Sequence, residues 1–299
     1  MATVRELLDV GIARLRDTGT DTARLDTELL LAHAVGTDRT AVIAHTDALV
    51  GDGPAARFMT FVERRAKGEP VAYIRGIKEF HGLAFGVDAR ALIPRPETER
   101  LVELTELETV RALVGAPRPA GAPKLRVIDV GAGSGAVAVT LAVLLRRRGM
   151  LDEVALTASD VSEEALQLAR ENAVAHAVGD RVTFVAADLL PGTETEPWDV
   201  VVANLPYVRS DAVPDLPVAA SFEPVIALDG GSDGLAVIGR LVDQLVVGLA
   251  HDGAAFIEIG WDQEEELRAL VAERLPGWSI EIERDLGGLP RVAILRRGS

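Results

Sequence analysis

The chain has 299 residues, of which 48% are hydrophobic, and a formal net charge of −15 at pH 7. Such an acidic balance argues against broad affinity for nucleic acid, whose phosphates are bound by clustered lysine and arginine. The sequence contains no cysteine, which excludes disulfides, thiolate metal ligands and cysteine nucleophiles.

Targeting and metal-binding signals are also missing from the sequence. No apolar run approaches the roughly 20 residues that span a membrane. The N-terminus, Met-Ala-Thr-Val-Arg-Glu-Leu-Leu, lacks a basic region followed by an apolar core. The five histidines are scattered without the spacing of metal ligands. We therefore expect a cytoplasmic protein that does not associate with membranes and holds no metal.

Residues 1–75 are predicted to form a small all-α domain. Apolar residues recur at helical spacing over residues 4–15 and over Thr22–Val35, and Ala55–Lys67 is amphipathic. Thr37-Asp38 is typical of the start of a short helix between them. The segment has no obvious chemical constellation, so it serves either docking and stability or substrate recognition.

Residues 76–92 change character and are predicted to form a β-hairpin linker. Aromatic residues and glycines alternate around Phe80-His81-Gly82, a pattern typical of two short strands. His81 stands alone and is expected to be structural. The next segment, Ile93-Pro94-Arg95-Pro96-Glu97-Thr98-Glu99, has two prolines that favour an extended backbone. Thr98 can begin the helix Glu99–Val114, after which residues 115–124 are expected to form a loop.

From Leu125 onward, predicted strands alternate with predicted helices. The strands are Leu125–Val130, Val154–Ser159, Arg181–Ala186, Asp199–Ala203, Gly253–Ile259, Trp278–Glu283 and Arg291–Leu295. The helices are Ala136–Arg147, Glu163–Ala177, Leu235–Leu249 and Asp262–Arg274. This alternation predicts an α/β fold with a mostly parallel, doubly wound sheet. The last two strands lack a helix between them, which predicts one antiparallel strand near the C-terminus.

A ligand site is predicted where the first three strands end. The turn Asp129-Val130-Gly131-Ala132-Gly133-Ser134-Gly135 joins the first strand to the first helix, and its glycines let the backbone approach a ligand closely. Asp160 ends the second strand, where a carboxylate can accept hydrogen bonds from both hydroxyls of a ribose. Ala187-Asp188-Leu189 follows the third strand and is placed to meet an adenine ring and its amino group.

The fourth strand ends in Asn204-Leu205-Pro206-Tyr207. Asn204 supplies an amide oxygen, the proline favours an extended Leu205 whose carbonyl is a second acceptor, and Tyr207 supplies a flat ring. Two acceptors beside a ring suit a planar –NH2 group, although an ordinary proline turn explains the tetrapeptide alone.

Gly131, Gly133 and Ala136 also satisfy a loose nicotinamide-dinucleotide fingerprint. Asp129, Asp188 and the lack of a hydride-transfer site disfavour that reading.

These motifs resemble those of class I S-adenosylmethionine-dependent methyltransferases over residues 125–297. With the Ile93–Glu99 segment, the hairpin and the helical N-terminal domain, the whole chain resembles the HemK/PrmC family. That family methylates the side-chain amide of glutamine in the Gly-Gly-Gln motif of bacterial peptide chain release factors. Later segments that also resemble the family are Phe222-Glu223-Pro224, Asp229-Gly230-Gly231, Glu258-Ile259-Gly260-Trp261 and Leu289-Pro290-Arg291-Val292.

The resemblance implies a Rossmann-like catalytic domain at 93–299, a substrate-recognition role for residues 1–75, and a monomer that acts on release factors. It implies S-adenosylmethionine as methyl donor and S-adenosylhomocysteine as product. Residues implied to bind this cofactor are Asp129, Gly131, Ala132, Gly133, Ser134 and Gly135 at the methionine part, Asp160 at the ribose, Asp188 and Leu189 at the adenine, and Asn204. Residues implied to act on the glutamine are Asn204, Leu205, Pro206 and Tyr207, with Arg95 at the mouth of the site.

One residue departs from the family pattern, which has Asn-Pro-Pro-Tyr where this chain has Asn204-Leu205-Pro206-Tyr207. Asn-Leu-Pro-Tyr is similar to the motif of ribosomal RNA adenine dimethyltransferases, but those enzymes lack the Ile93–Glu99 segment and the helical domain. The contact at position 205 is through a backbone carbonyl, which leucine also supplies. A ribosomal-protein glutamine, an exocyclic amine of adenine or cytosine, and a non-catalytic binding module remain alternatives.

Overall fold

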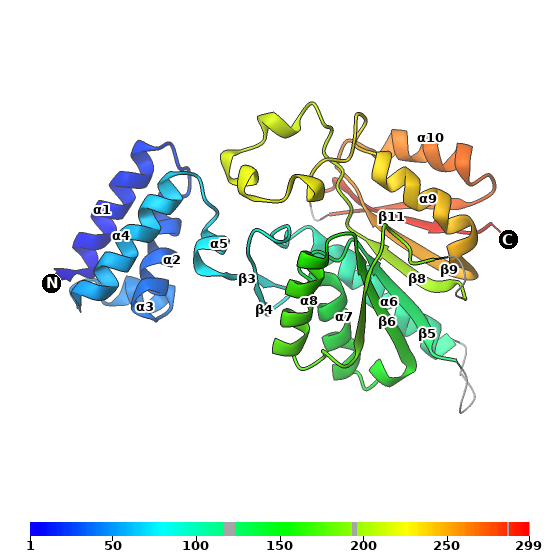
Figure 1. Ribbon diagram of the computed structural model, residues 1–299, viewed down its shortest axis with the longest axis horizontal. Coiled ribbons are helices and arrows are strands. Elements are labelled where there is room, and N and C mark those ends of the chain that lie inside the picture. The colour runs from blue at the N-terminus through cyan, green and yellow to red at the C-terminus, as the bar shows by residue number, and fades with distance from the viewer. Residues whose placement is uncertain (116–122, 193–195, 286, 299) are drawn as a thin grey trace. The chain divides into compact units, whose positions relative to one another are not determined.

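The computed structural model describes residues 1–115, 123–192, 196–285 and 287–298. The loop predicted at 115–124 falls mostly outside these residues. The chain divides into two compact units (Figure 1). One comprises Met1–Ile77 together with Leu216–Phe222, and the other comprises Lys78–Asp215 and Glu223–Ser299. The sequence pattern did not predict that residues 216–222 would pack with the N-terminal unit.

The N-terminal unit is built from helices around one apolar core. The helices are α1 (Val4–Asp17), α2 (Ala23–Val35), α3 (Arg39–Ala44), α4 (Asp52–Ala66) and α5 (Val71–Arg75). Helix α1 begins at a capping box in which the Glu6 amide donates to Thr3 Oγ1 and the Thr3 amide donates to Glu6 Oε2. Fully buried Leu15, Leu30 and Phe58 belong to the core. The predicted helices are confirmed, with two additions: the short helix α5, and β1 (Ala2–Thr3), which pairs with β2 (Leu49–Val50).

The predicted hairpin is present as β3 (Ile77–Phe80) and β4 (Leu83–Gly86). Its two-residue turn has positive φ at both positions, 52° at His81 and 71° at Gly82. That backbone matches the right-handed twist of a hairpin. The His81 amide also donates to Glu99 Oε1 at 2.9 Å, so His81 holds the turn against the start of the next helix.

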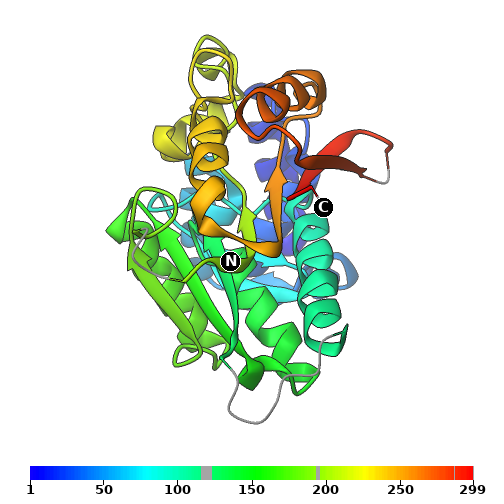
Figure 2. The same ribbon diagram turned by 90° about the vertical axis from the view of Figure 1, so that its right-hand side faces the viewer.

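The second unit is a seven-stranded sheet with helices on both faces (Figures 1 and 2). The strands are β5 (Leu125–Val130), β6 (Val154–Asp160), β7 (Val182–Ala186), β8 (Trp198–Ala203), β9 (Leu249–Glu258), β10 (Ser279–Arg284) and β11 (Pro290–Arg296). Their order is β10-β11-β9-β8-β5-β6-β7. Only β11 runs against the other strands of this sheet, which confirms the single antiparallel strand predicted near the C-terminus.

Two apolar clusters fill the spaces between the sheet and its helices. Helices α6 (Thr98–Gly115), α7 (Ala136–Arg147) and α8 (Glu163–Ala175) cover one face, and α9 (Ala236–Gly248) and α10 (Glu264–Arg274) cover the other. Alternate strand residues point to opposite faces, so Val200 and Val202 lie in one cluster and Val201 and Ala203 in the other. Among the described residues, no helix is both long and apolar enough to cross a membrane.

The order of the strands creates a switch point beside β5. The chain runs from β5 outward through β6 and β7, then returns to place β8 on the other side of β5. Asp129 consequently pairs with Ala158 on one side and with Val202 on the other. Ligands of open α/β sheets bind at such a point, beyond the carboxyl ends of the strands.

Candidate active site

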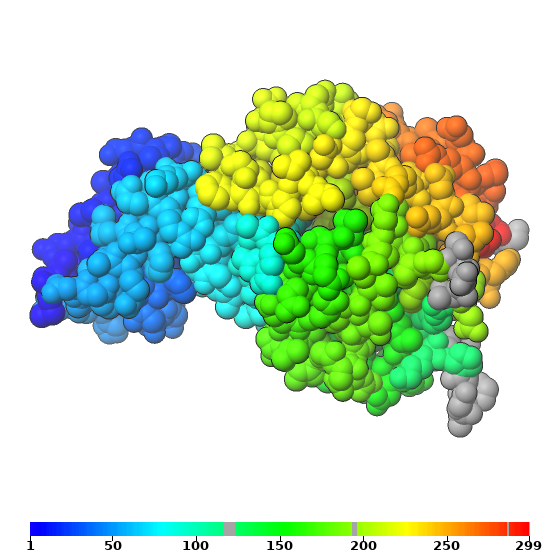
Figure 3. Space-filling view, viewed as in Figure 1, coloured from blue at the N-terminus to red at the C-terminus, as the bar shows by residue number. Residues whose placement is uncertain are grey.

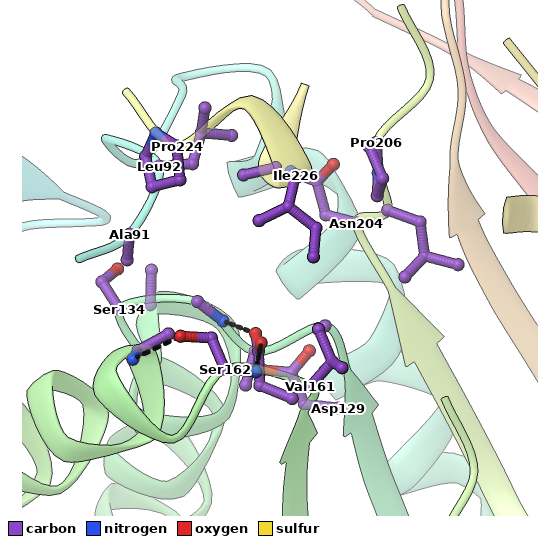
Figure 4. A pocket seen from close by; sticks show the side chains of 18 of the residues that line it. Ala91, Leu92, Asp129, Ser134, Val161, Ser162, Asn204, Pro206, Pro224 and Ile226 are labelled. Atoms are coloured by element: carbon purple, nitrogen blue, oxygen red, sulfur yellow. Dashed lines mark hydrogen bonds between the residues drawn. The ribbon is translucent and has the colours of Figure 1, made fainter. Parts of the chain in front are cut away.

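A cavity of about 490 Å³ opens at the carboxyl ends of β5, β6, β7 and β8 (Figure 4). Its walls also include the Ile93–Thr98 segment, the short 3₁₀ helix η4 (Val225–Ala227) and α9. In the space-filling view, the atoms of the segment around residues 223–240 (yellow) adjoin those of α8 and its neighbours (green) (Figure 3). The predicted site residues that line the cavity are Arg95, Asp129, Gly131, Ala132, Gly133, Ser134, Asp160, Asp188, Leu189, Asn204, Leu205 and Pro206.

The glycine turn after β5 is held tightly against its surroundings. The amides of Gly131 and Ala132 both donate to the Ser159 carbonyl, at 2.8 and 2.9 Å. Gly135 is the N-cap of α7 with φ of 79°, and a β-carbon there would lie 2.9 Å from the Ala169 β-carbon of α8. Gly135 therefore serves helix packing and does not itself line the cavity.

Asp129 is a buried carboxylate at the end of β5. Its Oδ2 accepts a hydrogen bond from the Ala138 amide at 3.0 Å, so it caps the first turn of α7, whose N-cap glycine has no side chain. Burial raises the pKa of Asp129 to about 7, and the charge of Asp160 acts in the same direction. A cationic group in the cavity would favour the charged form of this carboxyl.

Asp160 is fixed by two backbone amides. Oδ2 accepts from Gly133 at 2.9 Å, and Oδ1 accepts from Ser162 at 2.8 Å. Burial nevertheless raises the pKa of Asp160 above its usual value. Each carboxylate oxygen can accept a second hydrogen bond, so this rigid carboxylate can still receive two hydroxyl groups from a ligand.

Asp188 and Leu189 lie beyond the end of β7. Asp188 is exposed and forms an ion pair with Arg240 of α9, a cavity residue that the sequence pattern did not reveal. Leu189 is buried and has φ of 71°, which is uncommon for a residue with a branched side chain. Its carbonyl accepts a hydrogen bond from Ser159 Oγ at 2.9 Å, which holds this conformation. Leu189 and Asp188 thus add one apolar and one charged side chain to the cavity lining.

Asn204 projects into the cavity from the end of β8 (Figure 4). Its Nδ2 donates to Thr98 Oγ1 at 2.9 Å. The side-chain amide therefore has its donor end directed at α6 and its acceptor end left for the cavity. The sequence pattern presented Thr98 as the start of a helix, and the structure gives it this second contact.

The residues after Asn204 take different positions. Leu205 is buried and lines the cavity beside Gly131. Tyr207 packs against the apolar cluster around α9, and its hydroxyl donates to Glu258 Oε1 at 3.4 Å. Burial raises the pKa of Tyr207, and the negative charge of Glu258 raises it further. Within the described chain Tyr207 lies outside the cavity lining, unlike the ring position expected from the sequence.

Arg95 lines the cavity and is held by a buried acid. Its guanidinium lies 2.6 Å from Glu223 Oε1, and Glu223 Oε2 accepts from the Ile93 amide at 3.0 Å. Glu223 therefore ties the Ile93–Thr98 segment to the chain just before η4. Among the described residues, no group of three or more histidine, aspartate or glutamate side chains has the arrangement of a metal site.

Comparison with known proteins identifies the family. The PrmC N-terminal domain model matches residues 6–76, and the methyltransferase small domain model matches residues 116–222. The release factor glutamine methyltransferase of Bradyrhizobium diazoefficiens is 37% identical over 292 residues, which are 95% of this chain and 92% of that protein. The enzyme of the same name from Deinococcus radiodurans is 36% identical over 299 residues, 98% of each chain.

A likeness to solved structures supports the fold. The crystal structure of the hMettl16 catalytic domain in complex with a MAT2A 3′UTR hairpin matches with a TM-score of 0.52 over 83% of each chain. At 13% identity, this likeness shows the methyltransferase fold alone. The near full-length relatives decide the family, and they confirm the resemblance drawn from the motifs: the chain belongs to the PrmC (HemK) family of release factor glutamine methyltransferases.

Proposed function

We propose that this protein transfers a methyl group from S-adenosylmethionine to the side-chain amide nitrogen of the glutamine in the Gly-Gly-Gln motif of bacterial release factors. The observation that carries the proposal is the orientation of Asn204. Its Nδ2 is bonded to Thr98, so Oδ1 is the atom left to accept a hydrogen bond from an acceptor –NH2 group in the cavity. Both curated relatives described above are named for glutamine methylation of release factors.

The cavity residues fit S-adenosylmethionine, which supplies an electrophilic methyl group on a sulfonium when bound. Burial disfavours the charged form of the Asp129 carboxyl, and the cationic amino-acid moiety of the cofactor would stabilise that charged form. Asp160 keeps one free acceptor position on each oxygen, which suits a ribose with two hydroxyls. Leu189 and Val161 supply apolar surface for the adenine, and Asp188 lies beside them to accept from its amino group.

The acceptor nitrogen needs help because the lone pair of a carboxamide is delocalised into its carbonyl. Asn204 Oδ1 and the Leu205 carbonyl would accept its two N–H bonds and hold the nitrogen in line with the methyl group. The same two oxygens would stabilise the positive charge that develops on the nitrogen during transfer. We assign no general base: the nitrogen can release its proton to water after the N–C bond has formed.

The remaining parts of the proposal concern the partner. We propose that the helical N-terminal unit recognises the release factor, since residues 6–76 match the PrmC N-terminal domain. A single chain carries all the cavity residues, so a monomer suffices for the reaction. We place the reaction in the cytoplasm, where release factors act on ribosomes.

Mass spectrometry of a bacterial release factor tests the proposal. The purified factor is incubated with this protein and S-adenosylmethionine, and a second factor with alanine in place of the Gly-Gly-Gln glutamine serves as the control. The expected result is one added methyl group on that glutamine and none on the control. Cofactor binding without any methylation of the factor would refute this acceptor. Ribosomal-protein glutamine and exocyclic amines of adenine or cytosine would then be assayed in its place.

A further inference from the structure

Gln263 is a buried side chain that neither the cofactor contacts nor the acceptor contacts use. It lies between β9 and α10 and is 7% exposed. Its Oε1 accepts a hydrogen bond from the Gly260 amide at 2.8 Å. Its Nε2 donates to two carbonyl oxygens, those of Tyr207 at 3.0 Å and Gly234 at 3.2 Å. A buried amide with both of its ends engaged in this way holds its partners in one arrangement.

The direction of this side-chain amide is fixed by the main chain. The Gly260 N–H can only donate, and the carbonyls of Tyr207 and Gly234 can only accept. With the amide flipped, its oxygen would face both carbonyls and its –NH2 group would face the Gly260 N–H. Gln263 therefore joins three separate segments of the chain: the turn after β8, the loop before α9, and its own turn before α10.

The loop before α9, at residues 228–234, also holds the main chain that follows Tyr207. The Val208 amide donates to this loop at 3.0 Å, and the Val208 carbonyl accepts from it at 2.7 Å. The fit is close, because a β-carbon on Gly234 would lie 2.5 Å from the Tyr207 carbonyl oxygen. The main chain of Tyr207 and Val208 is thus held by hydrogen bonds to this loop and to Gln263.

These contacts bear on the Leu205 carbonyl, which is proposed to accept a hydrogen bond from the methyl acceptor. That oxygen must stay free for the substrate, so the turn has to be held on either side of it. On one side, Ala203 pairs with Ile257 in the sheet. On the other side, Pro206 has a fixed φ, which removes one of the free torsions between the Leu205 and Tyr207 carbonyls. Fixing the Tyr207 carbonyl therefore restricts the direction of the Leu205 carbonyl.

We propose that Gln263 is a positioning residue for methyl transfer: by holding the Tyr207 carbonyl, it sets the direction in which the Leu205 carbonyl meets the acceptor nitrogen. In the described part of the chain, Gln263 does not line the cavity, so it acts through the turn and not on the substrate. The anchoring of the turn follows from the structure, whereas its link to methyl transfer rests on the proposed function. A small displacement of an aligned group can lower a rate by about 100-fold.

Gln263→Glu and Asn172→Asp form a matched pair of variants that test this role. Asn172 is likewise buried, and its side-chain amide also makes three hydrogen bonds to the main chain. One of them, at 2.9 Å, is to the Ser134 carbonyl in the glycine turn after β5. Each change keeps an acceptor oxygen and removes the N–H groups that two carbonyls receive. We therefore expect both variants to have a lower melting temperature than wild type.

The two variants should differ in the step that they disturb. In Gln263→Glu, single-turnover methyl transfer to a release factor at saturating S-adenosylmethionine should fall by about 10-fold to 100-fold. The Kd for S-adenosylhomocysteine should stay within about threefold of wild type, whereas Asn172→Asp should raise this Kd further. Gln263→Met adds no charge and should repeat the loss of transfer if the glutamate variant does not fold. A folded Gln263 variant that transfers at the wild-type rate, or that matches Asn172→Asp in both quantities, would overturn the proposal.

A second readout needs no methyl acceptor. The Val208 and Gly230 amide protons lie in hydrogen bonds between the turn and the loop, and NMR can follow their exchange in the cofactor-bound protein. Relative to the amides of β5, we expect both to exchange at least about tenfold faster in Gln263→Met and to keep the wild-type ratio in Asn172→Asp. An unchanged ratio in Gln263→Met would overturn the anchoring role even if the enzyme methylates release factors. If wild type fails to methylate them, the proposed function fails, and the exchange rates still decide whether Gln263 holds the turn.

Discussion

Gly131 and Leu205 are in direct contact across the switch point of the sheet: a β-carbon on Gly131 would lie 2.9 Å from Leu205 Cδ2. Gly131 belongs to the turn after β5, and Leu205 belongs to the turn after β8, its neighbour in the sheet. The first turn is proposed to hold the methyl donor and the second to hold the acceptor. A bulkier residue at position 131 would therefore disturb both halves of the reaction.

The Gly131→Ala variant isolates this contact when compared with Gly149→Ala. Gly131 and Gly149 have φ of 73° and 71°, but a β-carbon at Gly149 would meet nothing within 4 Å. Both variants should lose roughly 1–2 kcal/mol from the left-handed backbone. Gly131→Ala should also weaken cofactor binding and lower kcat, because Leu205 must move. Urea unfolding and a cofactor titration measure the two effects, and equal behaviour of the variants would contradict the account.

Leu205→Pro tests whether position 205 acts through its backbone. The variant restores the tetrapeptide usual in the family and keeps the carbonyl oxygen, so we expect kcat within about threefold of wild type. The buried leucine side chain is lost, and stability should fall by about 1–3 kcal/mol. Single-turnover methylation and thermal unfolding measure these outcomes. A large fall in kcat would show that the leucine side chain itself takes part.

Asp160→Ala removes the carboxylate proposed to bind the ribose. The Kd for S-adenosylmethionine should rise more than tenfold, which corresponds to about 1.4 kcal/mol or more. Asp180→Ala, at an exposed aspartate outside the cavity, is the control and should leave Kd unchanged. Isothermal titration calorimetry measures both. An unaltered Kd in Asp160→Ala would remove this residue from the cofactor site.

Asp129→Asn should change how stability depends on pH. The pKa of Asp129 rises from an ordinary value of 3.8 to about 7 in the folded chain, mainly through burial. Its contribution to stability is therefore full below pH 4 and is lost as the pH rises through about 7, by at most about 1.4 kcal/mol per pH unit. The asparagine variant does not titrate there. In urea unfolding, wild type should lose stability relative to the variant between pH 4 and 7. Parallel curves of unfolding free energy against pH for the two proteins would refute the shifted pKa.

The fold and most of the cavity could be predicted because they follow from local patterns. Each strand of the parallel sheet is a short apolar run, and the polar residue that follows it must lie at the carboxyl edge. That rule found Asp129, Asp160 and Asn204.

What escaped prediction depends on contacts between distant segments. The Thr98–Asn204 hydrogen bond joins residues 106 positions apart, and the Arg95–Glu223 pair joins residues 128 apart. Neither pairing has a periodic signal in the sequence. Three short 3₁₀ helices lie within residues 213–227, and each is too short to show a periodic hydrophobic pattern in the sequence. Tyr207 was expected to lie against the substrate, whereas in the structure its ring packs against the apolar cluster around α9.

Replacement of Asn204 by alanine removes the side-chain oxygen that is proposed to hold the acceptor nitrogen. Single-turnover methyl transfer to a release factor is measured for wild type and Asn204→Ala, with the Kd for S-adenosylhomocysteine determined in parallel. We expect transfer to fall by about 100-fold or more, while Kd changes little, because Asn204 Oδ1 acts on the acceptor nitrogen. Near-full transfer by Asn204→Ala would contradict the account.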